Sequence, residues 1–288
     1  MVKLTKAQMK DRDRIEAWIK GEPFRENSRD KHPQVPHLTS EQVLETYVPL
    51  WISDCAKFYT PLEMGRLLID GHYIPAEPGY RILEPCSGIG NLIYHVYDRI
   101  EDGAIVDAYD LDDEAVKVGQ KMFPAVNWFH ATPFDNWQEI QGQYDLVLMN
   151  PPFGTTWGTT MGAEMSEGRA SKSEHFFLEL AIRALKANGL ACVIAPYNYY
   201  DKLPKKLRAW VDDRIMDFTD LGDLPGEFRF TGIRIHGWMI YRNSYDTWEK
   251  HFEEVMSVHP EPVQAAAPFT TSIPVQVEAG KPLQLPLF

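Results

Sequence analysis

Short apolar strands alternate with amphipathic helices along most of this 288-residue chain, and this alternation constrains its fold more than any other feature. Short links join the elements, which is typical of a parallel sheet covered by helices on both faces. Strands are expected at Arg81–Glu84, Ala104–Tyr109, Val126–His130, Tyr144–Met149, Leu190–Ala195, Met216–Leu221 and Arg234–Tyr241, and helices at Pro61–Asp70, Asn91–Arg99, Asp113–Met122, Glu174–Lys186 and Pro204–Asp212.

The last two expected strands have no helix between them, so they are expected to pair as an antiparallel edge of the sheet. The sequence therefore predicts an α/β fold with helices on both faces. Residues 1–50 are expected to form a helical extension and residues 51–256 the main domain. Residues 257–288 shift to Pro, Ala, Val and Gln and are expected to be a flexible tail.

The run Asn150-Pro151-Pro152-Phe153 directly follows the apolar strand Tyr144–Met149. The Asn side-chain oxygen and a main-chain carbonyl can each accept one N–H bond from a planar amino group. The proline rings stiffen this backbone because they fix φ, and the aromatic ring can stack on the ring that carries the amine. A Pro-rich turn after a strand is the alternative interpretation.

A second run, Arg81–Asn91, combines a strand, an acidic end, a Gly-x-Gly turn and the start of a helix. Glycines at Gly88 and Gly90 let a ligand approach the backbone, and such a turn in a doubly wound sheet is where nucleotide-like ligands bind. The run lacks the full dinucleotide fingerprint and a P-loop lysine, which disfavours a phosphate-bearing cofactor. Upstream, Thr60 and Pro61 suit the N-cap and first position of a helix.

In this order, the runs Phe58-Tyr59-Thr60-Pro61, Glu84-Pro85-x-x-Gly88-x-Gly90 and Asn150-Pro151-Pro152-Phe153 resemble the N6-adenine-specific DNA methyltransferases in which the cofactor motifs precede the catalytic one. The resemblance covers roughly residues 50 to 245. It implies a seven-stranded, Rossmann-like methyltransferase sheet, S-adenosylmethionine as cofactor, and methyl transfer to adenine N6 in DNA. The last run also occurs in enzymes that methylate RNA bases or glutamine side chains, but the Phe-Tyr-Thr-Pro run favours the DNA-adenine branch.

The resemblance also implies a role for each residue of the catalytic run, Asn150, Pro151, Pro152 and Phe153. The Asn150 side-chain oxygen and the Pro151 carbonyl would hold both hydrogens of the target amine. Duplex DNA buries adenine N6, so the base must flip out of the stack. Phe153 would then stack on one face of the base and Phe228 on the other, although Phe230 and a core role for both phenylalanines remain alternatives.

The cofactor contacts implied by the resemblance fall on several stretches. Glu84, Pro85, Gly88 and Gly90 would contact the methionine end, and Phe58, Tyr59 and Thr60 would close over it. Asp110 ends the second strand and suits the ribose hydroxyls. Thr132 stands where the family usually has an Asp, so Asp135 is the expected contact of the cofactor's adenine. No metal site is expected.

The formal net charge of −12 is unusual for a protein expected to bind DNA, because a polyanion is normally met by basic surface. Basic residues nevertheless cluster at Lys202–Arg208 and at Arg229 and Arg234. No apolar run reaches the length of a membrane span, and the N-terminus lacks the features of a signal peptide. The three cysteines have no metal-ligand spacing and indicate a reducing compartment. A cytoplasmic enzyme of a bacterial cell, plasmid or phage, without a membrane partner, is expected.

Residues Thr155–Ser171 follow the catalytic run and are too long for a simple link, so a loop that covers the site or contacts DNA is expected. No second folded unit is evident, such as the large recognition domain of many restriction-modification methyltransferases. Specificity is therefore low, or it comes from the first forty or so residues, this loop or a partner.

The last five residues suggest such a partner. Gln284-Leu285-Pro286-Leu287-Phe288 resembles the pentapeptide by which bacterial DNA-processing proteins bind the sliding clamp. Gln284, Leu285, Leu287 and Phe288 would make the contacts, and Pro286 would fill the variable position. The clamp is therefore an expected partner besides DNA.

Two alternatives to a DNA methyltransferase remain open at this point. One is an enzyme that methylates an amino group in RNA or a protein glutamine. The other is a non-catalytic methyltransferase-fold module that only recruits partners. Intact Asn150, Pro151, Gly88 and Gly90 argue against the module.

Overall fold

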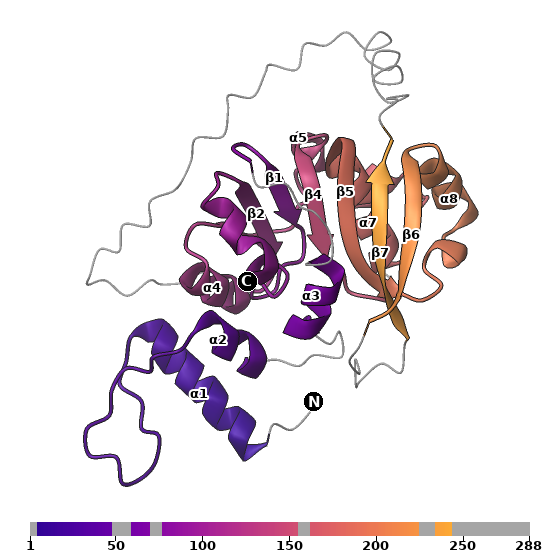
Figure 1. Cartoon of the computed structure of the whole chain (residues 1–288). Coiled ribbons are helices and arrows are strands. Elements are labelled where there is room, and N and C mark those ends of the chain that lie inside the picture. Colours follow the sequence, from indigo (N-terminus) through magenta and orange to yellow (C-terminus); the bar gives the residue numbers. More distant parts are fainter. Residues whose placement is uncertain (1–4, 48–58, 70–76, 155–161, 225–233, 244–288) are drawn as a thin grey trace. The chain divides into compact units, whose positions relative to one another are not determined.

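A computed structural model of the chain describes residues 5–47, 59–69, 77–154, 162–224 and 234–243. They contain a seven-stranded sheet in the order β3-β2-β1-β4-β5-β7-β6 (Figure 1). The strands are β1 (Arg81–Glu84), β2 (Ile105–Asp110), β3 (Asn127–His130), β4 (Tyr144–Met149), β5 (Leu185–Pro196), β6 (Ile215–Asp223) and β7 (Ile235–Arg242). Neighbours among β1 to β5 pair in parallel, whereas β7 is antiparallel to β5 and to β6. The predicted α/β fold is confirmed. Strand β7 lies one position inside the edge because it inserts between β5 and β6.

The helical elements are α1 (Lys6–Lys20), α2 (Ser40–Thr46), α3 (Leu62–Ile69), η1 (Ile93–Ile100), α4 (Asp113–Met122), α5 (Trp137–Ile140), α6 (Ala163–Ser166), α7 (Ser173–Ala184), η2 (Tyr200–Lys202) and α8 (Lys205–Asp212). The expected helix at Asn91–Arg99 is a 3₁₀ helix, η1, that begins two residues later. The short helices α5 and α6 and the turn η2 were not expected.

Side chains of successive strand residues point to opposite faces of the sheet, so each central strand feeds two cores. Ile82 packs in the core under α1 to α4 and η1, whereas the next residue, Leu83, packs in the core under α5 to α8. Leu146 and Val147 of β4 divide in the same way. This double burial explains why the central strands are nearly uninterrupted apolar runs.

The boundary between α7 and β5 differs from the prediction of a helix to Lys186 and a strand from Leu190. The helix ends at Ala184, and β5 begins at Leu185, which pairs with Tyr144. The register of this pairing shifts between Tyr144 and Leu146. Asn188, within this part of β5, adopts a positive φ of 62°.

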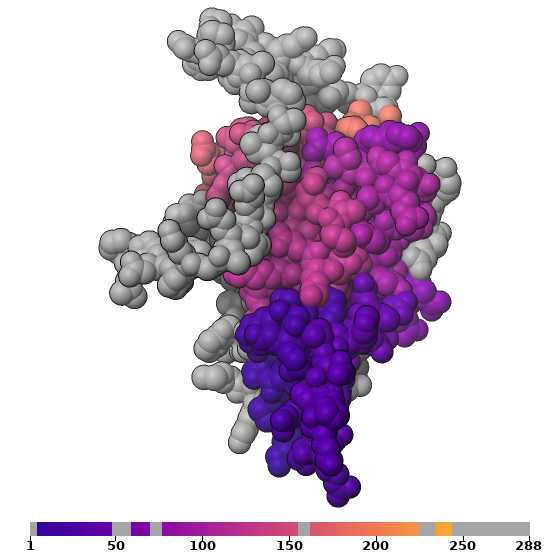
Figure 2. All heavy atoms as spheres, turned by 90° about the vertical axis from the view of Figure 1, so that its left-hand side faces the viewer, coloured from indigo at the N-terminus to yellow at the C-terminus, as the bar shows by residue number. Residues whose placement is uncertain are grey.

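The N-terminal helices lie against the face of the sheet that carries α4. Thr5 and Thr39 each form a capping box with the glutamine three residues on, and this fixes where α1 and α2 begin. Lys121 of α4 donates to the Ile19 carbonyl of α1, and its ammonium lies 5.0 Å from the Trp18 ring centroid. Figure 2 shows these indigo residues beside the purple part of the domain. The sequence Thr39-Ser40-Glu41 also predicts a helix through Tyr47 and Trp51; in the structure this helix, α2, ends at Thr46, and Trp51 lies outside the described residues.

Within the described ranges, no helix is long and apolar enough to cross a membrane, and no group of three or more His, Cys, Asp or Glu side chains is placed to hold a metal ion. The predicted tail, residues 257–288, lies outside those ranges, so the expected domain boundaries stay predictions.

Candidate active site

Three of the candidate stretches meet at one edge of the sheet because β1, β2 and β4 run parallel. Strand β1 pairs with β2 through Glu84 and Ala108, and with β4 through Leu83 and Val147. The carboxyl ends of these strands therefore bring Glu84, Asp110 and Asn150 to the same edge. In open α/β sheets this edge is where ligands bind.

The Gly-x-Gly turn after β1 is held against the end of β2. Gly88 has a φ of 54°, and its N–H donates to a carboxylate oxygen of Asp110 over 2.7 Å. The other Asp110 oxygen accepts from the Asp112 N–H over 2.8 Å. A Cβ at Gly88 would overlap the ring of Tyr59. Tyr59, from the predicted cofactor run, thus packs directly on the turn, which is why this position requires glycine.

Two buried acceptors flank this turn, Glu84 before it and Asn91 after it. One carboxylate oxygen of Glu84 and the side-chain oxygen of Asn91 have no hydrogen-bond partner among the described residues. Burial raises the pKa of Glu84 well above its ordinary value, the nearby charge of Asp110 raises it further, and the Ile93 N–H opposes both. Unpaired buried acceptors are costly unless a donor binds them. A ligand with an ammonium group and a sulfonium charge would supply that donor and favour the ionised carboxylate, so the residues present fit S-adenosylmethionine.

Cys86 lies between the two acceptors in the same turn, and its thiol is a poor nucleophile there. Its pKa is raised well above the ordinary value, mainly by burial and then by the charges of Glu84 and Asp110. A main-chain hydrogen bond from Asn150 opposes this shift. The neutral thiol packs the turn against the catalytic run.

The predicted catalytic Asn150 and the predicted cofactor residue Thr60 are in direct contact. The Asn150 side-chain nitrogen donates to the Thr60 hydroxyl over 3.1 Å, so the amide oxygen of Asn150 points away from Thr60. The Thr60 carbonyl accepts from the Asn91 side chain over 2.9 Å. Thr60 was expected to cap α3, but its hydroxyl accepts a hydrogen bond from Asn150 of the catalytic run instead. The carbonyl of Pro61 accepts hydrogen bonds from the N–H groups of Met64 and Gly65 in the first turn of α3.

The remaining predicted site residues differ in how buried they are, and some lie outside the described residues. Pro151 is buried, whereas Pro152 and Phe153 are half-buried, and Phe153 contacts the cores on both faces of the sheet. Asp135 is exposed in the turn between β3 and α5, and Thr132 beside it is buried. Phe58, Phe228 and the four clamp residues, Gln284, Leu285, Leu287 and Phe288, lie outside the described residues.

Part of the expected loop Thr155–Ser171 is packed into the domain. Residues 162–171 include α6, and Met165 is 1% exposed against α7. Arg169 forms an ion pair of 2.6 Å with Glu179, which is fully buried and also binds Arg183. Deletion of the whole stretch would therefore disturb the core. Residues 155–161 lie outside the described residues, so a covering loop there stays a prediction.

The two predicted basic clusters differ in how many of their positive charges are exposed and not paired with a carboxylate. Lys202, Lys205 and Lys206 are exposed beside the end of β5. By contrast, Arg234 forms two short hydrogen bonds with Asp223. Arg229 lies outside the described residues, so within the described parts of the two clusters the basic surface at the edge that carries Asn150 comes from Lys202, Lys205 and Lys206.

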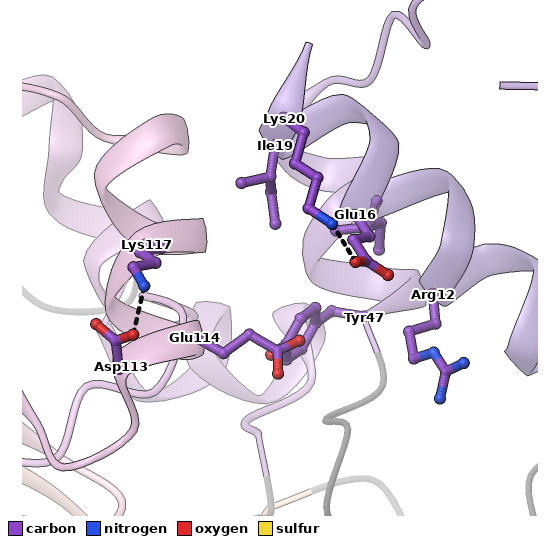
Figure 3. Close-up of a pocket in the computed structure, with 9 residues that line it drawn as sticks. Arg12, Glu16, Ile19, Lys20, Tyr47, Asp113, Glu114 and Lys117 are labelled. Atoms are coloured by element: carbon purple, nitrogen blue, oxygen red, sulfur yellow. Dashed lines mark hydrogen bonds and ion pairs between the residues drawn. The ribbon is translucent and has the colours of Figure 1, made fainter. Parts of the chain in front are cut away.

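A shallow pocket lies beside this site, between α1, α4 and Tyr47 (Figure 3). Four of its charged side chains pair within the pocket, Lys20 with Glu16 and Lys117 with Asp113. Tyr47 lies 5.4 Å from Tyr59, ring centroid to ring centroid, in an edge arrangement. Tyr47, which lines the pocket, therefore packs against Tyr59, the ring that lies on Gly88. The predicted catalytic residues do not line this pocket.

The stretch that carries this site is similar in sequence to a known family. Residues 88–224, which span the Gly-rich turn, Asp110 and Asn150, match the Eco57I restriction-modification methylase family. Over this stretch the chain is similar to N6-adenine methyltransferases. Among curated proteins, a tRNA1(Val) (adenine(37)-N6)-methyltransferase of Erwinia tasmaniensis is 25% identical over 163 residues, 53% of this chain and 65% of that protein. The methylase subunit of the type I restriction enzyme EcoEI of Escherichia coli is 25% identical over 166 residues, 50% of this chain and 33% of the subunit. The chain thus spans only part of these relatives.

Solved structures agree on the fold of this chain. A Listeria monocytogenes protein provisionally assigned to the class I S-adenosylmethionine-dependent methyltransferases superposes with a TM-score of 0.58 at 14% identity, over 84% of this chain and 82% of that one. A type I restriction-modification methyltransferase subunit from Streptococcus thermophilus gives 0.50 at 20% identity, over 65% and 45%. The class I fold and the family imply S-adenosylmethionine as the cofactor.

Three residues outside the predicted site hold its candidate runs in place. Asn91 follows the Gly-rich turn and holds Thr60, while Ser173 and Glu174 bind the main chain of the catalytic run. A polar residue directly after the turn was visible in the sequence. The contacts of Ser173 and Glu174 bridge about twenty residues and had no local signal.

Proposed function

We propose that this protein transfers a methyl group from S-adenosylmethionine to the N6 amine of adenine in DNA. The observation that carries the proposal is the hydrogen bond between Asn150 and Thr60, which joins the catalytic run to the cofactor run. It fixes an Asn-Pro-Pro-Phe sequence beside a Gly-rich turn with buried acceptors. This arrangement is suited to hold an amine next to a methyl donor.

The chain's own residues would act mainly by positioning. The Asn150 oxygen and the Pro151 carbonyl would accept the two N6 hydrogens, which favours a pyramidal nitrogen whose lone pair is directed at the methyl donor. Phe153 would stack on the flipped base, with Phe228 on its other face. The bound cofactor supplies an electrophilic methyl group, and the proton can leave N6 after transfer. Near-attack positioning of this kind can contribute about 7–11 kcal/mol.

The cofactor would be held by the residues around the turn. Glu84 and the stretch from Pro85 to Gly90 would contact its methionine end, with Tyr59 and Thr60 above. Asp110 would bind the ribose hydroxyls while keeping the turn closed through Gly88. Asp135 is exposed and stays the candidate for the adenine end.

DNA is favoured over RNA by the Phe-Tyr-Thr-Pro run and by the match to a restriction-modification methylase family. The relatives named as tRNA adenine methyltransferases keep tRNA as the second candidate substrate. The exposed cluster Lys202, Lys205 and Lys206 suits either polyanion.

The deciding experiment is methyl transfer from labelled S-adenosylmethionine to unmethylated DNA, to tRNA and to protein, in parallel. Label in N6-methyladenine of DNA supports the proposal, and label in tRNA alone or in protein glutamine replaces it with that substrate. Sequencing of DNA from expressing cells, with detection of modified bases, gives the sequence context. No transfer to any of the three would leave a binding module as the better account.

We further propose the bacterial sliding clamp as a partner, bound by Gln284, Leu285, Leu287 and Phe288. A partner pocket would bury the apolar side chains, the usual source of energy in small interfaces. The preceding tail would keep the enzyme near DNA and raise its effective concentration there. Such recruitment would offset the acidic net charge of −12.

A further inference from the structure

The first turn of α7 forms hydrogen bonds with the catalytic run. This turn follows the catalytic run in the sequence, whereas the cofactor motifs precede it. The Ser173 hydroxyl donates to the Pro152 carbonyl over 2.6 Å. One carboxylate oxygen of Glu174 accepts from the Gly154 N–H over 2.8 Å. Two successive residues therefore hold two main-chain groups that flank Phe153.

Both side chains are anchored in the interior. Ser173 is fully buried, and Glu174 is 5% exposed. The Tyr199 hydroxyl, in the turn after β5, donates to the Glu174 carbonyl over 2.6 Å. The negative charge of Glu174 also lies in the first turn of a 12-residue helix, where the helix dipole favours it. The first turn of α7 is thus fixed between the loops that follow β4 and β5.

This anchoring has a chemical consequence for the two carbonyls of the Pro-Pro pair. Ser173 engages the carbonyl of Pro152, so this carbonyl is directed into the protein. The ring of Pro152 fixes its φ, so ψ of Pro152 is the one soft dihedral that sets the direction of its carbonyl relative to the Pro151 carbonyl. Holding the Pro152 carbonyl inward therefore orients the Pro151 carbonyl, the second acceptor proposed for the target amine.

We propose that Ser173 and Glu174 are positioning residues that hold the segment Asn150–Gly154 in the conformation required for methyl transfer. This inference rests on the proposed function. The two residues do not touch the substrate: Ser173 sets the direction of the carbonyls, and Glu174 sets the position of Phe153 by fixing Gly154. Their effect should appear in the rate of transfer and in engagement of the target base, with cofactor binding preserved.

The test compares Glu174→Ala with Glu174→Gln, because the glutamine keeps an acceptor for the Gly154 N–H at nearly the same volume. Glu174→Ala should lower the single-turnover rate of methyl transfer roughly 10- to 100-fold, the range for a lost hydrogen bond to a charged group. Glu174→Gln should stay within a few-fold of wild type. The affinity for S-adenosylmethionine, measured by calorimetry, should change less than about two-fold in both, since neither contacts the cofactor turn.

Ser173→Ala tests the second contact, with Ser166→Ala as its matched control. Both serines are fully buried, and the Ser166 hydroxyl binds the Ala170 N–H, outside the catalytic run. Ser173→Ala should slow transfer about 10-fold and reduce the fluorescence change of 2-aminopurine at the target base, whereas Ser166→Ala should leave both nearly unchanged. Equal rate losses in the two serine variants, or in the two Glu174 variants, would overturn the proposal.

A readout without activity separates this proposal from the proposed function. Hydrogen exchange of the Gly154 amide should be faster in Glu174→Ala than in wild type and should return toward wild type in Glu174→Gln. If wild type methylates no nucleic acid, the proposed function fails and this exchange still tests the clamping of the segment. Unchanged exchange in Glu174→Ala would overturn the positioning role.

Discussion

The Asn150 side chain donates a hydrogen bond to the Thr60 hydroxyl over 3.1 Å, across 90 positions of the sequence. Thr60 belongs to the run before α3, and Asn91 holds its carbonyl from the far side of the Gly-rich turn. The amide of Asn150 is therefore oriented by residues of the cofactor side. The residues proposed to bind the cofactor and the amide proposed to be catalytic thus share one polar network.

Thr60→Val should separate these two roles. Valine keeps the shape of threonine and removes the acceptor for the Asn150 nitrogen, so the amide loses its fixed orientation. The single-turnover rate should fall about 10-fold, the effect of one buried hydrogen bond and the polar group left behind. Thr60→Ser keeps the hydroxyl and should stay near wild type. A valine variant as fast as the serine variant would show that this contact does not orient Asn150.

Asn150→Ala should abolish methyl transfer while cofactor binding persists. The proposed role of Asn150 is to hold the target amine, and losing one preorganised polar contact of this kind costs on the order of 10²–10³ in rate. Transfer is measured with labelled cofactor and binding by calorimetry on the same preparation. Near-normal turnover would end the catalytic assignment of Asn150.

Much of the sheet could be predicted because its strands are buried on both faces. Tyr144–Met149 was predicted at the bounds of β4, since an apolar run followed by prolines leaves little choice. The start of β5 could not be predicted in the same way. Leu185 pairs with Tyr144 although Asn188-Gly189 follows it, and a tertiary contact overrides the local signal of a turn.

The placement of the candidate residues was predictable where a motif at the end of a strand sets it, and not where it depends on contacts across the fold. Glu84, Gly88 and Asp110 were expected from their places at strand ends, and the parallel sheet brings them together. Thr60 was interpreted as a helix cap, because nothing nearby in the sequence reveals its bond to Asn150. Ser173 and Glu174 were missed for the same reason, since their partners become neighbours only after folding.

Asp110→Ala should weaken cofactor affinity more than it slows turnover at saturating cofactor. Ribose contacts are the same in the ground and transition states, so their loss changes binding and not the barrier of the bound complex. Asp110 also holds Gly88 and the Asp112 N–H, so the turn should loosen as well. Asp110→Asn, which keeps one acceptor, should have the smaller effect. Unchanged affinity in calorimetry would remove Asp110 from the cofactor site.

A peptide of the last residues should bind purified bacterial sliding clamp in a fluorescence titration. Leu287 and Phe288 would supply most of the buried apolar surface, so the peptide with Leu287→Ala and Phe288→Ala should bind far more weakly. The full-length double variant should keep its activity on short DNA, because the tail is proposed to recruit and not to catalyse. Equal binding by the two peptides, or none by either, would remove the clamp as a partner.

The buried carboxyl of Glu84 should make stability depend on pH in a specific direction. Burial and the charge of Asp110 raise its pKa in the folded protein well above the ordinary 4.5. Between these two values the folded protein binds one more proton than the unfolded chain. The free energy of unfolding should therefore fall as pH rises from about 4.5 through the raised pKa.

Glu84→Gln removes this titration and keeps the shape of the side chain. Without cofactor, the variant should gain in melting temperature relative to wild type as pH rises through that range, and the difference should become constant above the raised pKa. Cationic S-adenosylmethionine should favour the ionised carboxylate, so its binding should release a proton in wild type and not in the variant. Calorimetry in buffers of different ionisation enthalpy measures that proton. The exposed Glu63→Gln serves as the matched control and should follow wild type in both measurements. Parallel pH profiles of wild type and Glu84→Gln, with equal proton release, would show that Glu84 is not the cofactor's counter-charge.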